Sequence, residues 1–244
     1  MSRPAIEARV QAEYFDHADV EHFHWTTAGA IADTEDALLA PVLDALQAPC
    51  LEIGCGEGNN LVRLARRVRC LGTDLFAAKL RFAAAELPTV PFAAADAAAL
   101  PFRDGSFRSV FIRDLLHHVP APERVLAEAM RVLAPGGRFC LLEPNGRNPI
   151  VNLHSRLVPA EAAERTSDPE HIATLLRGLP LEDMRMTTAQ PLPLSRLVLH
   201  YRLGLPGLGR VASLRRALVT IEELVGRLLP RSRWAYVAVV AARC

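Results

Sequence analysis

The chain alternates two hydrophobic patterns between residues 49 and 142. Short runs that are apolar throughout predict buried strands at 50–53, 70–74, 90–95, 109–112 and 138–142. Longer segments, in which apolar residues recur every three or four positions, predict helices at 60–69, 76–87 and 122–133. Buried strands that are separated by helices are typical of a parallel sheet covered on both faces. The pattern therefore predicts an α/β fold.

The flanking regions follow different patterns. Residues 1–48 combine an aromatic-rich stretch with a helical pattern near 35–46, and we expect them to form a lid. Two further strands are predicted at 182–189 and 234–242, and between them lies a Leu- and Arg-rich segment with the pattern of two amphipathic helices, broken at 204–209. The sequence thus predicts three parts: an N-terminal helical lid (1–48), a core (49–190 and 231–244) and a helical cap inserted at 191–230.

The first predicted strand runs into a turn with three glycines, Gly54, Gly56 and Gly58. Glycine lets a backbone approach a ligand closely, and the helix that follows points its free N–H groups into the same space. The spacing is G-x-G-x-G, which differs from the G-x-G-x-x-G of dinucleotide sites. Glu52 precedes the first glycine by two residues. A carboxylate there suits a positively charged ligand group, which a pyrophosphate does not supply.

Charge is balanced overall but unevenly distributed. The formal net charge is +1, yet nine arginines and two glutamates after residue 186 give that region +7 and leave −6 for the rest. This asymmetry fits an anionic partner such as a membrane surface, and it equally fits a set of solvated helix faces. No apolar run approaches the ~20 residues that span a bilayer, and the first residues lack the signal-peptide pattern.

The five cysteines are scattered, odd in number and without zinc-ligand spacing. Several lie in apolar strand-like runs, where a reduced thiol behaves as a small hydrophobic group. The sequence therefore predicts reduced cysteines, no metal site and a cytoplasmic protein, with peripheral contact to a membrane left open.

Six sequence features, taken in their order along the chain, indicate a resemblance to a known family. They are the glycine turn at 51–58, Asp74 and Asp96 at the ends of the second and third strands, and the segments 100–107, 116–120 and 133–139. This series resembles the class I S-adenosylmethionine-dependent methyltransferases, specifically the small-molecule branch that includes the ubiquinone- and menaquinone-biosynthesis type. The resemblance covers about residues 49–143. It implies a Rossmann-like, seven-stranded, mostly parallel sheet with helices on both faces and S-adenosylmethionine as the cofactor.

The resemblance also implies cofactor-binding roles. Glu52 would face the amino group of the cofactor, Asp74 would accept hydrogen bonds from both ribose hydroxyls, and Leu75 would lie against the adenine. Asp96, with the backbone of Ala97, would bind the N6 edge of the adenine. The residues of the turn would pack under the methionine part: Gly54, Cys55, Gly56, Gly58 and Asn59.

Four residues after the fourth strand extend this picture. Arg113 stands where relatives carry a small polar residue whose backbone carbonyl holds the cofactor ammonium, so its backbone is the part expected to act. His117 or His118 could serve as a general base for an acceptor hydroxyl, and Asp114 is a comparable candidate. A packing role for the two histidines is an equal alternative.

Other residues are expected near the acceptor. Asn145 and Arg147 lie in a loop after the fifth strand, which reaches the open end of the sheet or serves as a rigid connection. A group of aromatic residues would close over cofactor and acceptor, or pack the segment on the sheet edge: Tyr14, Phe15, His24 and Trp25.

These observations predict methyl transfer to a small, hydrophobic or lipid-like acceptor, on oxygen, with transfer to nitrogen or carbon as the alternative. An NAD(P)-dependent oxidoreductase and a catalytically silent S-adenosylmethionine-binding protein are the competing classes. The cap is hydrophobic and bordered by arginines. Such a surface could bind a lipid-like acceptor, contact a membrane, form a homodimer or pack within the protein. Nucleic acid is not expected as a partner, because no base-flipping motif is present.

Overall fold

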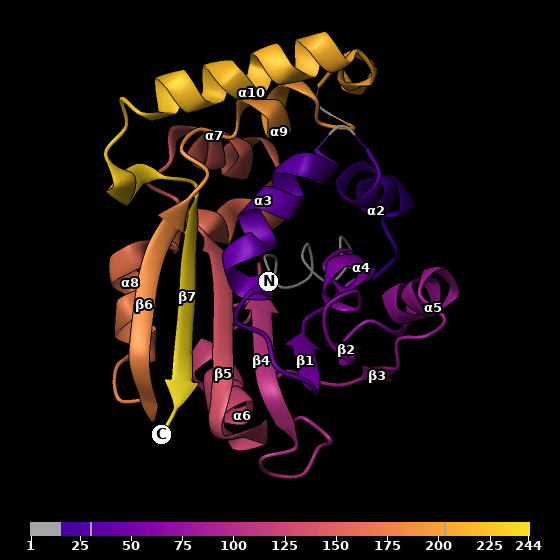
Figure 1. Ribbon diagram of the computed structural model, residues 1–244, viewed down its shortest axis with the longest axis vertical. Helices are drawn as coiled ribbons and strands as arrows, with labels where there is room; N and C mark the ends of the chain where they lie inside the picture. The colour runs from indigo at the N-terminus through magenta and orange to yellow at the C-terminus, as the bar shows by residue number, and fades with distance from the viewer. Residues whose placement is uncertain (1–15, 30, 203) are drawn as a thin grey trace, which may run out of the picture.

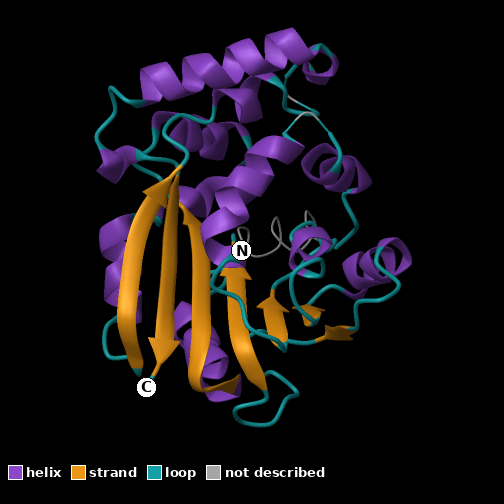
Figure 2. Ribbon diagram, viewed as in Figure 1, coloured by secondary structure: helices purple, strands orange, loops and turns teal. Residues whose placement is uncertain are grey.

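The computed structural model describes residues 16–29, 31–202 and 204–244. Its centre is a seven-stranded sheet with the order β3-β2-β1-β4-β5-β7-β6, in which β7 runs antiparallel to both neighbours (Figure 2). The strands are Cys50–Ile53 (β1), Cys70–Asp74 (β2), Phe92–Ala94 (β3), Phe107–Arg113 (β4), Leu133–Pro144 (β5), Leu181–Ala189 (β6) and Tyr236–Arg243 (β7). The predicted α/β fold with a mostly parallel sheet is confirmed.

Helices cover the sheet on both faces and at one end. The α-helices are Val20–Thr27 (α2), Ala32–Leu43 (α3), Leu61–Leu64 (α4), Ala77–Glu86 (α5), Pro122–Val132 (α6), Pro149–Leu157 (α7), Pro169–Leu176 (α8), Leu194–Val198 (α9) and Ala212–Gly226 (α10). Short 3₁₀ segments lie at Pro159–Thr166 (η1), Pro206–Arg210 (η2) and Arg231–Arg233 (η3). In the described part of the chain, no helix has both the length and the apolar character that crossing a bilayer requires.

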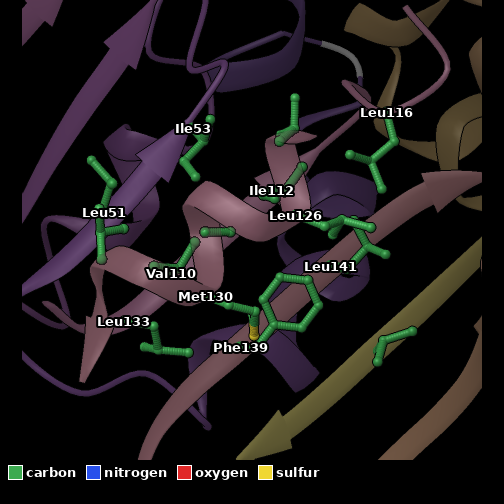
Figure 3. Packing of buried hydrophobic residues seen from close by; sticks show 14 of the residues in the cluster. Leu51, Ile53, Val110, Ile112, Leu116, Leu126, Met130, Leu133, Phe139 and Leu141 are labelled. Carbon is green, nitrogen blue, oxygen red and sulfur yellow. The ribbon is translucent and has the colours of Figure 1, made fainter. Parts of the chain in front are cut away.

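Two hydrophobic cores hold these layers together. On one face Val110, Ile112 and Leu141 pack against α6 and α8 (Figure 3). On the other face the intervening residues Phe111 and Cys140 pack with α3, α4 and α5. Successive strand residues point to opposite faces, so strands that are apolar throughout are buried on both sides. This explains why the central strands lack polar alternation.

The fourth and fifth strands are longer than predicted, at Phe107–Arg113 and Leu133–Pro144, and two other elements are much shorter. The helix expected at 60–69 is α-helical only over Leu61–Leu64, because the backbone tightens into i→i+3 hydrogen bonds from Arg66 N to Arg63 O and from Arg67 N to Leu64 O. The third strand, expected at 90–95, is shortened to Phe92–Ala94. Both changes lie at element ends, where local pattern is least informative.

The carboxyl ends of β1, β4 and β5 point toward one end of the molecule, where α2, α3, α9 and α10 lie (Figure 1). The strand order reverses between β1 and β4, which is where open α/β sheets bind ligands. Residues in and beside α2 are hydrogen-bonded there to the predicted cap. Trp25 Nε1 donates to Leu199 O at 2.8 Å, and the Tyr201 hydroxyl donates to Asp19 Oδ2 at 2.6 Å. Helix α2 of the expected lid and the 199–201 segment of the expected cap are therefore joined, and we call these two joined segments the roof.

Candidate functional site

A cavity of about 580 Å³ opens at the carboxyl ends of the first four strands. Its walls include residues 53–56 after β1, 73–76 after β2, 95–98 after β3 and 113–115 after β4. This volume lies in the range of small-molecule sites, which proteins usually form in such crevices. The predicted strand ends thus meet around one space.

The glycine turn forms the floor of this cavity and is tied to β2. Gly54 N and Cys55 N both donate to Thr73 O at 2.8 Å. Gly54 has a φ of +74°, and a Cβ there would lie 2.9 Å from the side chain of Leu115. The backbone conformation therefore favours glycine at this position, and a larger residue would also have to displace the end of the Leu115 side chain.

Asp74 is held in place by backbone groups on either side. Its Oδ2 accepts from Gly56 N at 2.9 Å, and its Oδ1 accepts from Phe76 N at 2.9 Å. Each carboxylate oxygen has a second lone pair, so Asp74 can still accept two hydrogen bonds from a ligand on the cavity side. The Asp74 carboxylate is thus held in one orientation and can still accept hydrogen bonds from a ligand.

The rest of the predicted nucleoside-binding set lies on the same wall. Leu75 is 64% exposed, which is unusual for a leucine beside a buried strand. Asp96 accepts from Ala98 N at 2.8 Å, and Asp96 and Ala97 both line the cavity. An apolar surface next to polar acceptors is the arrangement that a nucleoside requires.

Glu52 is fully buried beneath the turn. Its Oε1 accepts from Asn60 Nδ2 at 2.6 Å, whereas its Oε2 has no hydrogen-bond partner among the described residues. Burial raises the pKa of Glu52 to about 8, against the opposing effects of Asn60 and Arg113. A buried carboxyl oxygen without a partner is costly, and it fits a site that a cationic group completes.

Arg113 belongs to a buried charge network that the sequence analysis did not foresee. Its Nη1 lies 2.7 Å from Glu35 Oε2 and donates to Asn60 Oδ1 at 2.9 Å. Arg196 of the cap also bonds to Glu35. Burial alone would raise the pKa of Glu35, but the charges of Arg113 and Arg196 outweigh it and lower that pKa to about 2. The network links α3, β4, the glycine turn and the cap.

A second cavity, of about 250 Å³, lies under the roof. It shares wall residues with the first cavity, among them Asp114 and His118. Trp25 and Tyr201 of the roof also line it. Burial raises the pKa of Asp114, although Arg113 opposes the shift. The shared wall is where groups bound in the two cavities come nearest to each other.

The two neighbouring histidines have different environments. His117 is enclosed, with Nδ1 2.7 Å from Glu143 Oε2, and Glu143 Oε1 in turn accepts from the backbone N–H groups of Leu115 and Leu116. Burial lowers the pKa of His117, but the charge of Glu143 outweighs this and raises it well above its usual value. His118, by contrast, lines both cavities. His118 is therefore the one placed to contact a ligand.

Two acceptor-site predictions are corrected by the structure. Asn145 is fully buried and donates from Nδ2 to Ser232 O at 3.0 Å and to Trp234 O at 2.7 Å, so it holds η3 and β7 in place. Arg147 is turned toward α8, where it pairs with Asp168 and Glu170. Neither residue is on the wall of either cavity. The polar groups of both side chains have their hydrogen-bond or ion-pair partners outside the two cavities.

The predicted aromatic lid residues have different positions. Trp25 is buried and lines the second cavity, while its neighbour His24 is exposed and is not on the wall of either cavity. Tyr14 and Phe15 lie outside the described residues. Helical periodicity accounts for the first difference, because adjacent helix positions point in different directions.

Part of the chain is similar to known proteins. A profile described as a methyltransferase domain matches residues 51–141. The trans-aconitate 2-methyltransferase of Variovorax paradoxus is 33% identical over 149 residues, which cover 59% of this chain and 57% of that protein. The demethylmenaquinone methyltransferase of Paenarthrobacter aurescens is 31% identical over 143 residues, covering 54% and 56%. The chain thus spans little more than half the length of these relatives.

The fold has similar solved structures. An S-adenosylmethionine-dependent methyltransferase from Thermotoga maritima superimposes with a TM-score of 0.65 at 18% identity, covering 98% of this chain and 99% of that one. At this level of identity the likeness concerns the fold.

Proposed function

A family model described as a methyltransferase domain matches residues 51–141. On that premise we propose that this chain is a class I S-adenosylmethionine-dependent methyltransferase, which transfers a methyl group from S-adenosylmethionine to an oxygen atom of a small, hydrophobic acceptor. The observation that carries the proposal is the buried Glu52 Oε2, which has no hydrogen-bond partner among the described residues and lies next in sequence to Ile53 on the cavity wall. The same cavity is lined by the exposed Leu75. Such a site offers a carboxylate for the ligand's cationic group and an apolar surface for its adenine ring.

The residues present fit this cofactor. Glu52 would hold the amino group, Asp74 the ribose hydroxyls, Leu75 the adenine face, and Asp96 with Ala97 the adenine edge. When bound, S-adenosylmethionine supplies an electrophilic methyl carbon on a sulfonium. A dinucleotide would instead bring a pyrophosphate toward Glu52 and Asp74, which disfavours an NAD(P)-dependent oxidoreductase.

The chain's own residues position the acceptor. The second cavity holds it under the roof, with Trp25 excluding water. His118 and Asp114 stand on the shared wall, where either can receive the proton that an acceptor hydroxyl loses. Alignment of cofactor and acceptor supplies much of the rate acceleration in such a displacement. The roof contributes to catalysis because it holds the acceptor in position.

S-adenosylhomocysteine is expected to bind in titration calorimetry with an affinity that rises between pH 6 and 8, whereas NADH is expected not to bind. The free Glu52 carboxyl has a pKa of about 8, so below that pH it carries a proton. Seating the ligand's ammonium favours the ionised carboxylate and releases this proton, so the association constant should grow by up to about tenfold per pH unit.

The matched variants are Glu52→Gln and Glu86→Gln, the latter at an exposed position of α5. The first should weaken binding and remove the pH slope, and the second should change neither. Tight NADH binding without S-adenosylhomocysteine binding would overturn the proposed function. Binding without methyl transfer to any of a panel of hydrophobic hydroxyl compounds would favour a silent binding protein.

The cap supports a further part of this proposal, that the acceptor is reached at an anionic membrane surface. Four side chains at spacings of seven, three and four residues form an exposed stripe on α10 and just beyond it: Leu214, Ile221, Leu224 and Leu228. Exposed arginines at 210, 216 and 227 border the stripe. An apolar stripe with basic edges is typical of helices that lie in a membrane interface.

Sedimentation with vesicles tests the membrane contact. The protein should sediment with phosphatidylcholine vesicles that contain phosphatidylglycerol, less so at high salt, and the double variant I221E/L224E should lose this binding. Met184→Glu is the control, because Met184 is similarly exposed on β6. If the double variant instead converts a dimer to a monomer in size-exclusion chromatography and leaves vesicle binding unchanged, the stripe is an interface between two copies and the membrane proposal is wrong.

A further inference from the structure

Three metal-ligating side chains converge at the wall of the second cavity. His117 and His118 follow β4, and Glu161 lies on η1, more than forty residues later. One nitrogen from each ring and one carboxylate oxygen all lie within 4.8 Å of one another. Because the sequence separation is large, motif spacing does not show this cluster.

The distances between these atoms are compatible with a shared metal ion. Glu161 Oε2 lies 3.3 Å from His118 Nε2 and 3.7 Å from His117 Nε2. In a tetrahedral site with bonds of about 2.0–2.2 Å, neighbouring ligand atoms lie ~3.4 Å apart. His117 Nε2 is buried and has no hydrogen-bond partner within the described residues. The three atoms thus surround a point that each can reach.

The groups behind these ligands are arranged as metal sites require. His117 Nδ1 lies 2.7 Å from Glu143 Oε2, and Glu143 is itself held by two backbone N–H groups. A carboxylate on Nδ1 fixes the ring orientation and makes Nε2 the ligand, as in carboxylate–histidine–metal triads. Glu164, a second largely buried acid, also lines this cavity, where it lies 3.3 Å from His154 Nδ1.

We propose that His117, His118 and Glu161 bind a divalent transition-metal cation on the wall of the acceptor cavity. Two imidazole nitrogens and one carboxylate favour ions such as Zn²⁺, Mn²⁺, Fe²⁺ or Co²⁺ over Ca²⁺ and Mg²⁺. The inference departs from the sequence-based expectation of no metal, which rested on cysteine spacing.

The location gives the cation a role that rests on the proposed function. His118 and Glu161 line the second cavity, so the remaining coordination positions face the acceptor. An oxygen-bearing acceptor can occupy one of them, which orients that oxygen and lowers the pKa of a hydroxyl. His118 is then a ligand, and Asp114 is left to receive the hydroxyl proton. The metal would select acceptors with an oxygen beside an apolar body.

Metal binding by the tag-free full chain is measured without reference to catalysis. Elemental analysis after dialysis against Zn²⁺ should find about one ion per chain, and Co²⁺ should produce a visible d–d absorption band with the same stoichiometry. Glu161→Gln should weaken Co²⁺ binding at least ~10-fold and remove the band, while His171→Ala, at an exposed histidine of α8, should leave both unchanged. His118→Ala provides a second test at another ligand.

The outcomes separate the two proposals. Wild-type protein without stoichiometric metal and without a Co²⁺ band, or Glu161→Gln protein that keeps both, would overturn the metal site and leave an ion-pair network of His117 with its two glutamates. S-adenosylhomocysteine binding is the independent readout, because Glu161 is not on the wall of the first cavity. If Co²⁺ binds but S-adenosylhomocysteine does not, the metal site stands and the proposed function fails.

Discussion

Replacing Arg113 with methionine should lower the free energy of unfolding by about 3 kcal/mol, a fall of roughly 6–12 °C in Tm for a chain of this size. The Arg113 and Glu35 side chains are only 6% and 3% exposed, and Arg113 also bonds to Asn60 and Asp114. Removal of the guanidinium takes away one of the two ion-pair partners of Glu35 and deprives Asn60 of a donor. Urea unfolding at pH 7 measures the loss.

The acid dependence provides a sharper check on the same variant. Glu35 has a folded-state pKa of about 2, below its usual 4.5, so its contribution to stability is present above pH 4.5 and is lost as the pH falls toward 2. The difference between wild type and Arg113→Met should therefore shrink over this window. Arg108→Met is the control, because Arg108 is exposed and bonds to Gln47, and it should change stability by less than about 0.5 kcal/mol. A loss equal to that of the control would contradict the network.

Asp74→Asn should weaken S-adenosylhomocysteine binding by about 10- to 100-fold, equivalent to roughly 1.5–3 kcal/mol. Both carboxylate oxygens of Asp74 already accept a backbone hydrogen bond, from Gly56 N and Phe76 N. An asparagine turns its NH₂ toward one of these N–H groups or toward a ribose hydroxyl position, and in either orientation one acceptor is lost. Calorimetry at pH 8 measures the change.

Asp183→Asn is the matched control for this prediction. Asp183 is exposed on β6 and is not on the wall of either cavity. Its substitution should leave the affinity within twofold of wild type. If Asp74→Asn protein bound S-adenosylhomocysteine as tightly as the control, the assignment of the first cavity to a nucleoside would be wrong.

The sequence determined the central sheet and the acids at its edge. Parallel strands end at one edge, so a carboxylate at or just after a buried strand must lie beside the others. Asp74 and Asp96 follow that rule and line one cavity. Gly54 could also be inferred, because a strand that turns directly into a helix needs a conformation with positive φ. These features depend on local pattern, which a single sequence displays.

Only the tertiary structure decided which side chains from distant elements and loops meet. Arg196 reaches Glu35 across 161 residues, and Glu161 reaches the histidines after β4 from a separate 3₁₀ segment. Asn145 and Arg147 lie after a strand as predicted, yet their side chains turn to η3 and α8. A loop's position follows from the strand before it, whereas the direction of its side chains depends on the partners that packing brings near. For this reason the cofactor edge was predictable, and the buried charge network and the histidine–glutamate cluster were not.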